Sequence, residues 1–222
     1  MGFFSAIGSF VSSVCSVVSS AVSAIGSAIV TGATKLLEIA GKGIEAVINT
    51  IRQVGVALGV IQPDEDLEKL GEKAMVADKK VEDFDYVSDY IQYLRDEVEV
   101  DKAKFDKLED KDKLARKAIG ATIVSKGIEE KKDTIIPMEF WVETTKQGMG
   151  QKEITGVIDM FKESSVENNF FDFCKGKLGF KEKVKTSNLL VEMYKELEPD
   201  LSNDDIENKI INMKNVSKEE GV

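Results

Sequence analysis

The sequence predicts an all-α protein in which a glycine- and serine-rich apolar helical hairpin packs on, or is tethered to, an acidic body of several helices. Three observations support this fold class. Apolar residues recur at steps of three and four along most of the chain, which is the period of a helix. No run alternates apolar and polar residues as a half-buried strand does. The 222 residues include only 3 prolines, a composition that suits long helices.

Charge divides the chain into two parts. Residues 1–62 have few charged side chains and a net charge of about +1, whereas the whole chain has a formal net charge of −10. The acidic excess therefore lies beyond Pro63, and the stretch "IQPDED" marks the boundary. We accordingly predict two domains, an apolar hairpin over residues 1–62 and an acidic helical body over residues 63–222.

The first part begins with a stretch, residues 3–34, that contains no charged side chain. Its large apolar residues share one face of a helix, and we predict that this face enters a membrane. The predicted membrane-inserting residues are Phe3, Phe4, Ile7, Phe10, Val14, Val18, Val22, Ile25 and Ile29. Serine fills much of the other face. Because valine and serine are weak helix formers in water, we expect this helix to form only when protein or lipid covers its apolar face.

Small residues in the same stretch recur every four positions. The predicted helix-packing residues are Gly8, Ser12, Ser16, Ser20, Ser23, Gly26 and Ser27. Such rows allow helix backbones to approach closely and drive helix association in membranes. A tight helix–helix contact inside an ordinary soluble fold would use the same spacing, so the spacing alone leaves both interpretations open.

The next stretch, residues 35–61, carries a second apolar stripe. Lys35, Lys42 and Arg52 lie where a helix resting on lipid would present cations to anionic headgroups. Bends at Gly32 and at 41–43 would give a hairpin of two helices, of about 27 and 18 residues. The first would be roughly 40 Å long, enough to cross a hydrocarbon core of about 30 Å.

A cleaved leader, a lipid anchor and a permanent membrane anchor each fit this N-terminal stretch less well. A secretory signal peptide requires a basic segment ahead of its apolar region, and "MGFF" has none. N-myristoylation requires Ser or Thr at the position of Ala6. A constitutive anchor would be flanked by a cluster of positive charges. A core hairpin wrapped by the acidic helices remains the plain structural alternative.

The acidic body shows one amphipathic helix after another. Residues 118–128 form a second apolar island, which could pack against the hairpin. Residues 135–150 are the least helical passage, because they contain Pro137 and several glycines.

Composition also restricts the chemistry that we expect. Histidine is absent, which removes the commonest general base and the commonest zinc ligand. Cys15 and Cys174 form no CxxC pair, and Cys174 is expected to be a buried packing residue. Net negative charge argues against nucleic acid as a partner. We therefore predict no enzymatic activity, no metal site and no cofactor.

Residues 1–62 predict a membrane-active protein. Their layout resembles that of small helical toxins and secretion-system effectors with an N-terminal hydrophobic hairpin and, more loosely, the amphipathic arms of non-enveloped virus penetration proteins. The resemblance concerns arrangement only and assigns no residue a role. It implies a pore-forming or permeabilising protein that is secreted or delivered to a target membrane and is soluble before insertion.

The expected partners are a lipid bilayer, further copies of the chain, and a delivery, chaperone or neutralising protein. Acidic pH is a hypothetical trigger, since protonation would lower the charge of the body. The alternative is a non-enzymatic interaction protein whose apolar helices dock into a larger assembly or a chaperone.

Overall fold

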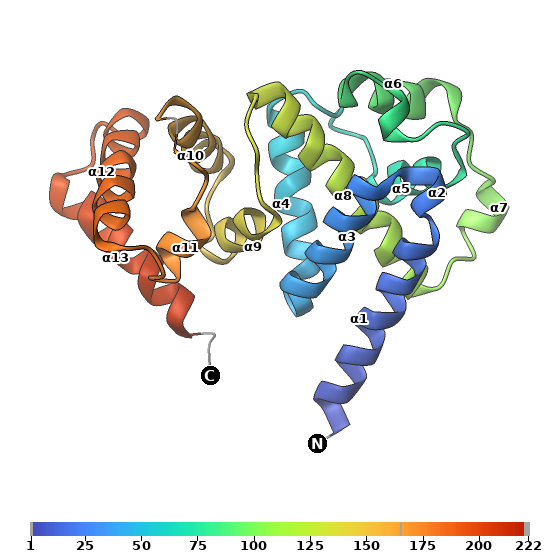
Figure 1. Ribbon diagram of the computed structural model, residues 1–222, viewed down its shortest axis with the longest axis horizontal. Coiled ribbons are helices and arrows are strands. Elements are labelled where there is room, and N and C mark those ends of the chain that lie inside the picture. The colour runs from blue at the N-terminus through green and yellow to red at the C-terminus, as the bar shows by residue number, and fades with distance from the viewer. Residues whose placement is uncertain (1, 165, 220–222) are drawn as a thin grey trace. The chain divides into compact units, whose positions relative to one another are not determined.

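The computed structural model describes the backbone of residues 2–164 and 166–219 and the side chains of residues 9–164 and 166–217. All regular structure in these ranges is helical and no strand occurs in them, which confirms the predicted all-α class (Figure 1). The chain divides into two compact units, residues 1–131 and 132–222. The boundary that the charge pattern predicts between residues 62 and 63 falls inside the first unit. The division of the chain into an apolar hairpin and an acidic body therefore stays a prediction.

The first unit begins with a series of helices connected by short breaks. They are α1 (Gly2–Ser20), α2 (Val22–Ile25), α3 (Ser27–Ala40), η1 (Gly41–Gly43) and α4 (Ile44–Ala57). α1 packs on α3, and α2 contacts α5 (Leu67–Val76). The N-terminal part of α1 extends beyond the other helices of its unit (Figure 1).

The prediction of one long first helix with a bend at Gly32 is wrong. Gly32 lies inside α3, whereas the chain breaks after Ser20 and again at Gly26. Gly26 has φ of 87°, a left-handed conformation that side chains other than glycine rarely adopt. The other predicted bend, at 41–43, is present as the 3₁₀ turn η1.

α8 (Asp110–Lys132) is the central helix of the first unit. Between Ala115 and Ile128 its side chains are buried on nearly every side of the helix, so it lacks the single apolar stripe of a surface helix. α4, α5 and α6 (Val87–Glu97) lie against it, and a Cβ added to Gly55 of α4 would lie 2.5 Å from Val124 Cγ1. The apolar island 118–128 therefore does contact the N-terminal part of the chain. The connections contain η2 (Val81–Asp83) and α7 (Lys102–Phe105).

The second unit consists of α9 (Met138–Lys146), α10 (Gln151–Glu163), α11 (Phe170–Cys174), α12 (Phe180–Leu197) and α13 (Asn203–Glu219). α10 packs on α12, α12 on α13, and α9 on α11. The ring of Phe140 contacts Trp141 and Phe170 edge-to-face, with centroids 5.4 and 5.9 Å apart. The passage predicted to be least helical contains α9, because Pro137 immediately precedes the helix, where its missing N–H is not needed.

Candidate functional site

The apolar face of the front segment, defined as α1 to α3 (residues 2–40), is largely covered by the chain itself. The predicted membrane-inserting residues with no exposed surface are Val14, Val18, Ile25 and Ile29. Phe10 and Val22 differ, since they are 42 % and 46 % exposed. Phe3, Phe4, Ile7 and Gly8 lie outside the residues whose side chains are described. Among the members of the stripe whose side chains are described, four are sheltered and two lie at the surface.

The serines of the predicted helix-packing row lie at the surface. The exposed members are Ser12, Ser16, Ser20, Ser23 and Ser27. The hydroxyls of Ser13 and Ser20 each donate a hydrogen bond to the main-chain carbonyl three residues earlier, and both donor–acceptor distances are 2.7 Å. Such bonds satisfy a hydroxyl within its own helix, which lowers the cost of removing it from water.

Residues 21–26, the hinge segment, connect α1 to α3, and Glu82 of η2 holds their C-terminal end. The Ser27 amide donates a hydrogen bond to Glu82 Oε1 at 2.9 Å. A Cβ added to Gly26 would lie 1.8 Å from Glu82 Oε2, so a larger residue would have to displace the carboxylate from its present position. A carboxylate at this place also complements the positive end of the α3 dipole. Gly26, predicted to serve helix packing, therefore serves a turn.

The predicted headgroup-binding cations occupy different environments. Lys35 and Lys42 are exposed. Arg52 is half-buried, and its guanidinium donates hydrogen bonds to the carbonyl oxygens of Glu65, at 3.2 Å from Nε, and of Pro63. Arg52 is thus occupied with the loop that follows α4.

The front segment does not provide a transmembrane helix of the expected kind. In the described part of the chain no helix combines the length and hydropathy needed to cross a bilayer. α1 has 19 residues, because the chain turns after Ser20. The expected first helix, roughly 40 Å long by its rise per residue, is interrupted between α1 and α2 and again between α2 and α3.

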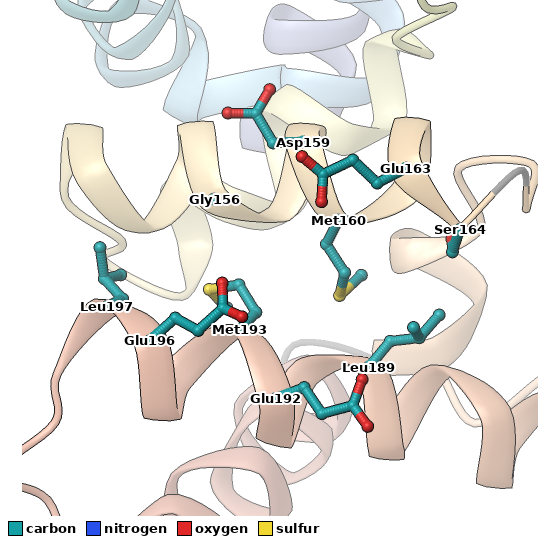
Figure 2. Close-up of a pocket in the computed structure, with 10 residues that line it drawn as sticks. All are labelled: Gly156, Asp159, Met160, Glu163, Ser164, Leu189, Glu192, Met193, Glu196 and Leu197. Atoms are coloured by element: carbon teal, nitrogen blue, oxygen red, sulfur yellow. The ribbon is translucent and has the colours of Figure 1, made fainter.

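A groove between α10 and α12 is a second candidate site, which the sequence analysis missed (Figure 2). Its volume is about 530 Å³. The lining residues are Gly156, Asp159, Met160, Glu163, Ser164, Leu189, Glu192, Met193, Glu196 and Leu197. Each helix contributes two carboxylates four positions apart, a spacing that places them on one helix face. The same spacing is common on solvated helices, so by itself it does not indicate a site.

The four carboxylates of the groove differ in their partners. Asp159 accepts hydrogen bonds from Lys132 Nζ, which lies 2.8 Å from each carboxylate oxygen. No ion pair or hydrogen bond joins the side chains of Glu163, Glu192 or Glu196 to another residue in the described ranges. The groove is therefore strongly acidic, and no Lys or Arg is among its described lining residues.

The two thiols do not have the environment of reactive cysteines. Burial, together with the charge of Glu143, raises the pKa of the Cys174 thiol, and the residue is fully buried as predicted. Burial and then the charge of Glu38 raise the pKa of Cys15. Both thiols stay protonated at neutral pH, which makes them poor nucleophiles. No group of three or more metal-ligating side chains gathers in the part of the chain that the structure describes.

Comparison with known proteins identifies no relative: no protein-family model, no curated protein and no solved structure matches the chain. The front segment and the groove therefore have to be interpreted from their own geometry. They lie in different compact units and differ in chemistry, since one lacks charge over most of its length and the other concentrates negative charge.

Proposed function

We propose that this chain is a membrane-active protein whose front segment leaves its packed position and enters a target bilayer. The observation that supports the proposal is that α1 lacks charge and is only partly covered by the rest of the chain. The 19 residues of α1 include no charged side chain, and over residues 9–20, whose side chains are described, the inner face is covered by the chain and the outer face is exposed. Solubility normally requires charge on an exposed helix face, and its lack marks a surface that contacts another phase or another protein.

The burial of the inner face makes release conditional. Covering one Val or Ile side chain stabilises a protein by about 1.5–3 kcal/mol, so uncovering four such residues costs roughly 6–12 kcal/mol. That cost is comparable with the entire stability of a domain, about 5–15 kcal/mol. We therefore expect the front segment to stay with the body in water and to leave it only where lipid covers the same residues.

An interfacial position is the mode of insertion that agrees best with the absence of a described crossing helix. An amphipathic helix lies in the plane of the bilayer with its apolar face about 5–10 Å below the headgroups. Lys35 and Lys42 would then contact anionic headgroups. The exposed serine row would allow copies of α1 to approach one another, so a homo-oligomer is the expected permeabilising form.

In this proposal the front segment is a hairpin element tethered to the acidic body, as the charge pattern predicts. The hinge segment and Glu82 form the tether, and the body shelters the apolar face before insertion. The protein would be a non-enzymatic toxin or effector, secreted or delivered in soluble form. A chaperone or neutralising protein would cover the exposed Phe10 and Val22.

Dye release from anionic liposomes tests the proposal. The full chain is expected to cause leakage, and Ser16→Glu is expected to reduce it at least tenfold, because a larger, charged side chain in the serine row would prevent copies of α1 from approaching one another. Gln92→Glu is the matched control, since it adds the same charge at an exposed position of α6. Far-UV circular dichroism checks that both variants remain folded. Retention of full leakage by Ser16→Glu contradicts the inserted-helix proposal.

The alternative function is docking of the front segment onto another protein. The exposure of Phe10 and of the serine row supports this alternative. In that case the same surface would bind a groove of a larger assembly or a chaperone. Measuring leakage and co-purification together distinguishes the two functions. If the full chain causes no leakage at about pH 7 or about pH 5 but co-purifies with a large assembly, and Phe10→Ser abolishes this association, the surface docks and the membrane function is excluded.

A further inference from the structure

The groove between α10 and α12 has the chemistry of a peptide-binding surface. We propose that it binds a cationic amphipathic helix of a partner protein, with the apolar face of that helix on the groove floor and its Lys or Arg side chains against the carboxylates. This inference concerns the second unit and does not depend on membrane activity of the front segment.

The floor of the groove is apolar and adaptable. It is formed by Met160 of α10 and by Leu189, Met193 and Leu197 of α12 (Figure 2). The leucines and Met193 are spaced four apart, so they follow one side of α12. Methionine side chains are flexible and polarisable, and they adjust to partners of different shape.

Gly156 keeps one side of the groove open. It lies in the middle of α10 and faces Met193, and a Cβ added there would lie 2.9 Å from Met193 Sδ. Any larger side chain would fill the space between the two helices. Glycine inside a helix lowers helix stability by about 1 kcal/mol relative to alanine. At this position that cost leaves the space beside Met193 open.

The rim of the groove attracts cations. Glu163 comes from α10, and Glu192 and Glu196 come from α12, so both walls carry negative charge (Figure 2). None of the three has an ion-pair partner in the described part of the chain, whereas Asp159 is neutralised by Lys132. Like charges around an apolar floor repel one another, and a bound cation relieves this repulsion.

A helix satisfies these features better than an isolated cation does. A free ammonium group would contact the rim but leave the apolar floor uncovered. A helix places apolar side chains at i, i+3, i+4 and i+7 on one face, with cations on either flank. Residues 3–34 of this chain are not the occupant, because they contain no Lys or Arg side chain.

Fluorescence anisotropy with a labelled synthetic peptide tests the inference. The probe is a Leu/Lys helix of about 18 residues with one apolar face, and the control peptide has the same composition in scrambled order. At about 150 mM salt we expect the full chain to bind the amphipathic peptide at least tenfold more tightly than the scrambled one.

Matched variants locate the binding. The triple variant Glu163→Gln, Glu192→Gln, Glu196→Gln is expected to weaken binding at least tenfold. The control triple Glu167→Gln, Asp200→Asn, Glu207→Gln removes the same charge at exposed positions of the same unit outside the groove and is expected to change binding less than twofold. Equal effects of the two triples, equal binding of the two peptides, or no binding of either peptide would each overturn the proposal.

Discussion

Gly71 on α5 and Gly120 on α8 mark the place where the backbones of these two helices meet. A Cβ added to Gly71 would lie 2.0 Å from the carbonyl oxygen of Arg116, and one added to Gly120 would lie 2.1 Å from that of Leu67. Because a main-chain carbonyl cannot rotate away as the end of a side chain can, neither position has room for a methyl group. The central helix of the first unit is therefore held by contacts that only glycine permits.

Gly120→Ala is expected to lower the free energy of unfolding by about 2 kcal/mol, because overpacking costs about 1–3 kcal/mol. The measurement is urea unfolding followed by far-UV circular dichroism. Gly156→Ala is the matched control, since that glycine is also inside a helix but faces only the flexible end of Met193. In Gly156→Ala the free energy of unfolding should stay unchanged or rise by up to about 1 kcal/mol. Equal losses in both variants would contradict the close contact.

These glycines show what a sequence pattern can and cannot locate. The sequence predicted a row of small residues for close helix packing, and it placed that row on the front segment. Within the chain the serines of that row are exposed, and the close helix contact is between α5 and α8. A single glycine in "EKLGEK" has no periodic signal, because its role depends on which helix lies opposite.

At the scale of elements, two ion pairs connect α8 to its neighbours in contrasting environments. Arg116 pairs with Glu72 of α5, and both side chains are only 11 % exposed. The next residue, Lys117, pairs with Glu45 of α4 at 3.0 Å, and Glu45 is 62 % exposed. The first pair is largely withdrawn from water, where an unpaired charge is costly, and the second lies nearer the surface.

Glu72→Gln is expected to destabilise the first unit by about 3 kcal/mol, because it leaves the Arg116 charge buried without a counter-ion. Glu45→Gln removes an exposed partner and should cost less than about 1 kcal/mol. Thermal unfolding of the two variants compares them directly, since each changes one carboxylate to an amide. A smaller loss for Glu72→Gln than for Glu45→Gln would refute the assignment of the buried pair.

The hinge segment leads to a prediction about release. Glu82→Ala removes the acceptor of the Ser27 amide and a capping interaction of about 1 kcal/mol, which corresponds to about a fivefold change in a population. If the front segment acts on membranes, the variant should release dye about fivefold faster than the natural sequence at neutral pH. Glu97→Ala, an exposed carboxylate at the end of α6, is the control and should leave the rate unchanged.

Helix positions were predictable from periodicity wherever a helix had one apolar stripe, as α6 and α10 do. Helix boundaries depended on tertiary contacts and were harder to predict. Next to the break at Gly26, the Ser27 amide bonds to Glu82, which lies 55 residues away from Ser27 in the chain. The groove required knowledge that α10 packs on α12, since neither helix alone differs from a solvated one.

At the scale of the whole molecule, a polar cluster joins three helices of the second unit. Glu153 Oε1 of α10 accepts hydrogen bonds from Lys209 Nζ of α13 at 2.8 Å and from the Tyr194 hydroxyl of α12 at 3.1 Å. Burial raises the pKa of Glu153, but the bonds from Lys209, the Gly150 amide and Tyr194 outweigh this effect and lower the pKa overall. Burial lowers the pKa of Lys209, and its two carboxylate partners raise it overall.

The sign of these shifts predicts a dependence of stability on pH. A lowered carboxyl pKa stabilises the folded state above the unfolded pKa of about 4.3, and this contribution is lost as pH falls through the folded pKa. The raised pKa of Lys209 contributes below the unfolded pKa of about 10.4 and is lost at higher pH. Trp141, which is the only tryptophan and lies in this unit, reports the unfolding by fluorescence. Between about pH 5 and about pH 3 the midpoint in urea should fall, and it should fall less in Glu153→Gln.

An exposed carboxylate of the same unit provides the control for this measurement. Glu207→Gln removes a carboxylate from α13 that lies at the surface. The slope of stability against pH should match that of the natural sequence in this variant. A slope in Glu153→Gln as steep as in Glu207→Gln would contradict the role of the cluster.

The central position of α8 also has a consequence for how the protein is made. The surfaces of α4 that α8 covers are synthesised before residues 110–132 exist, and the two stretches are separated by more than 50 positions of chain. At about 5–20 residues per second the ribosome needs several seconds to supply the missing helix. During that interval the buried face of α4 lacks the helix that packs against it. A nascent chain of this sequence is therefore expected to bind chaperones that recognise apolar segments, and to release them once α8 has emerged.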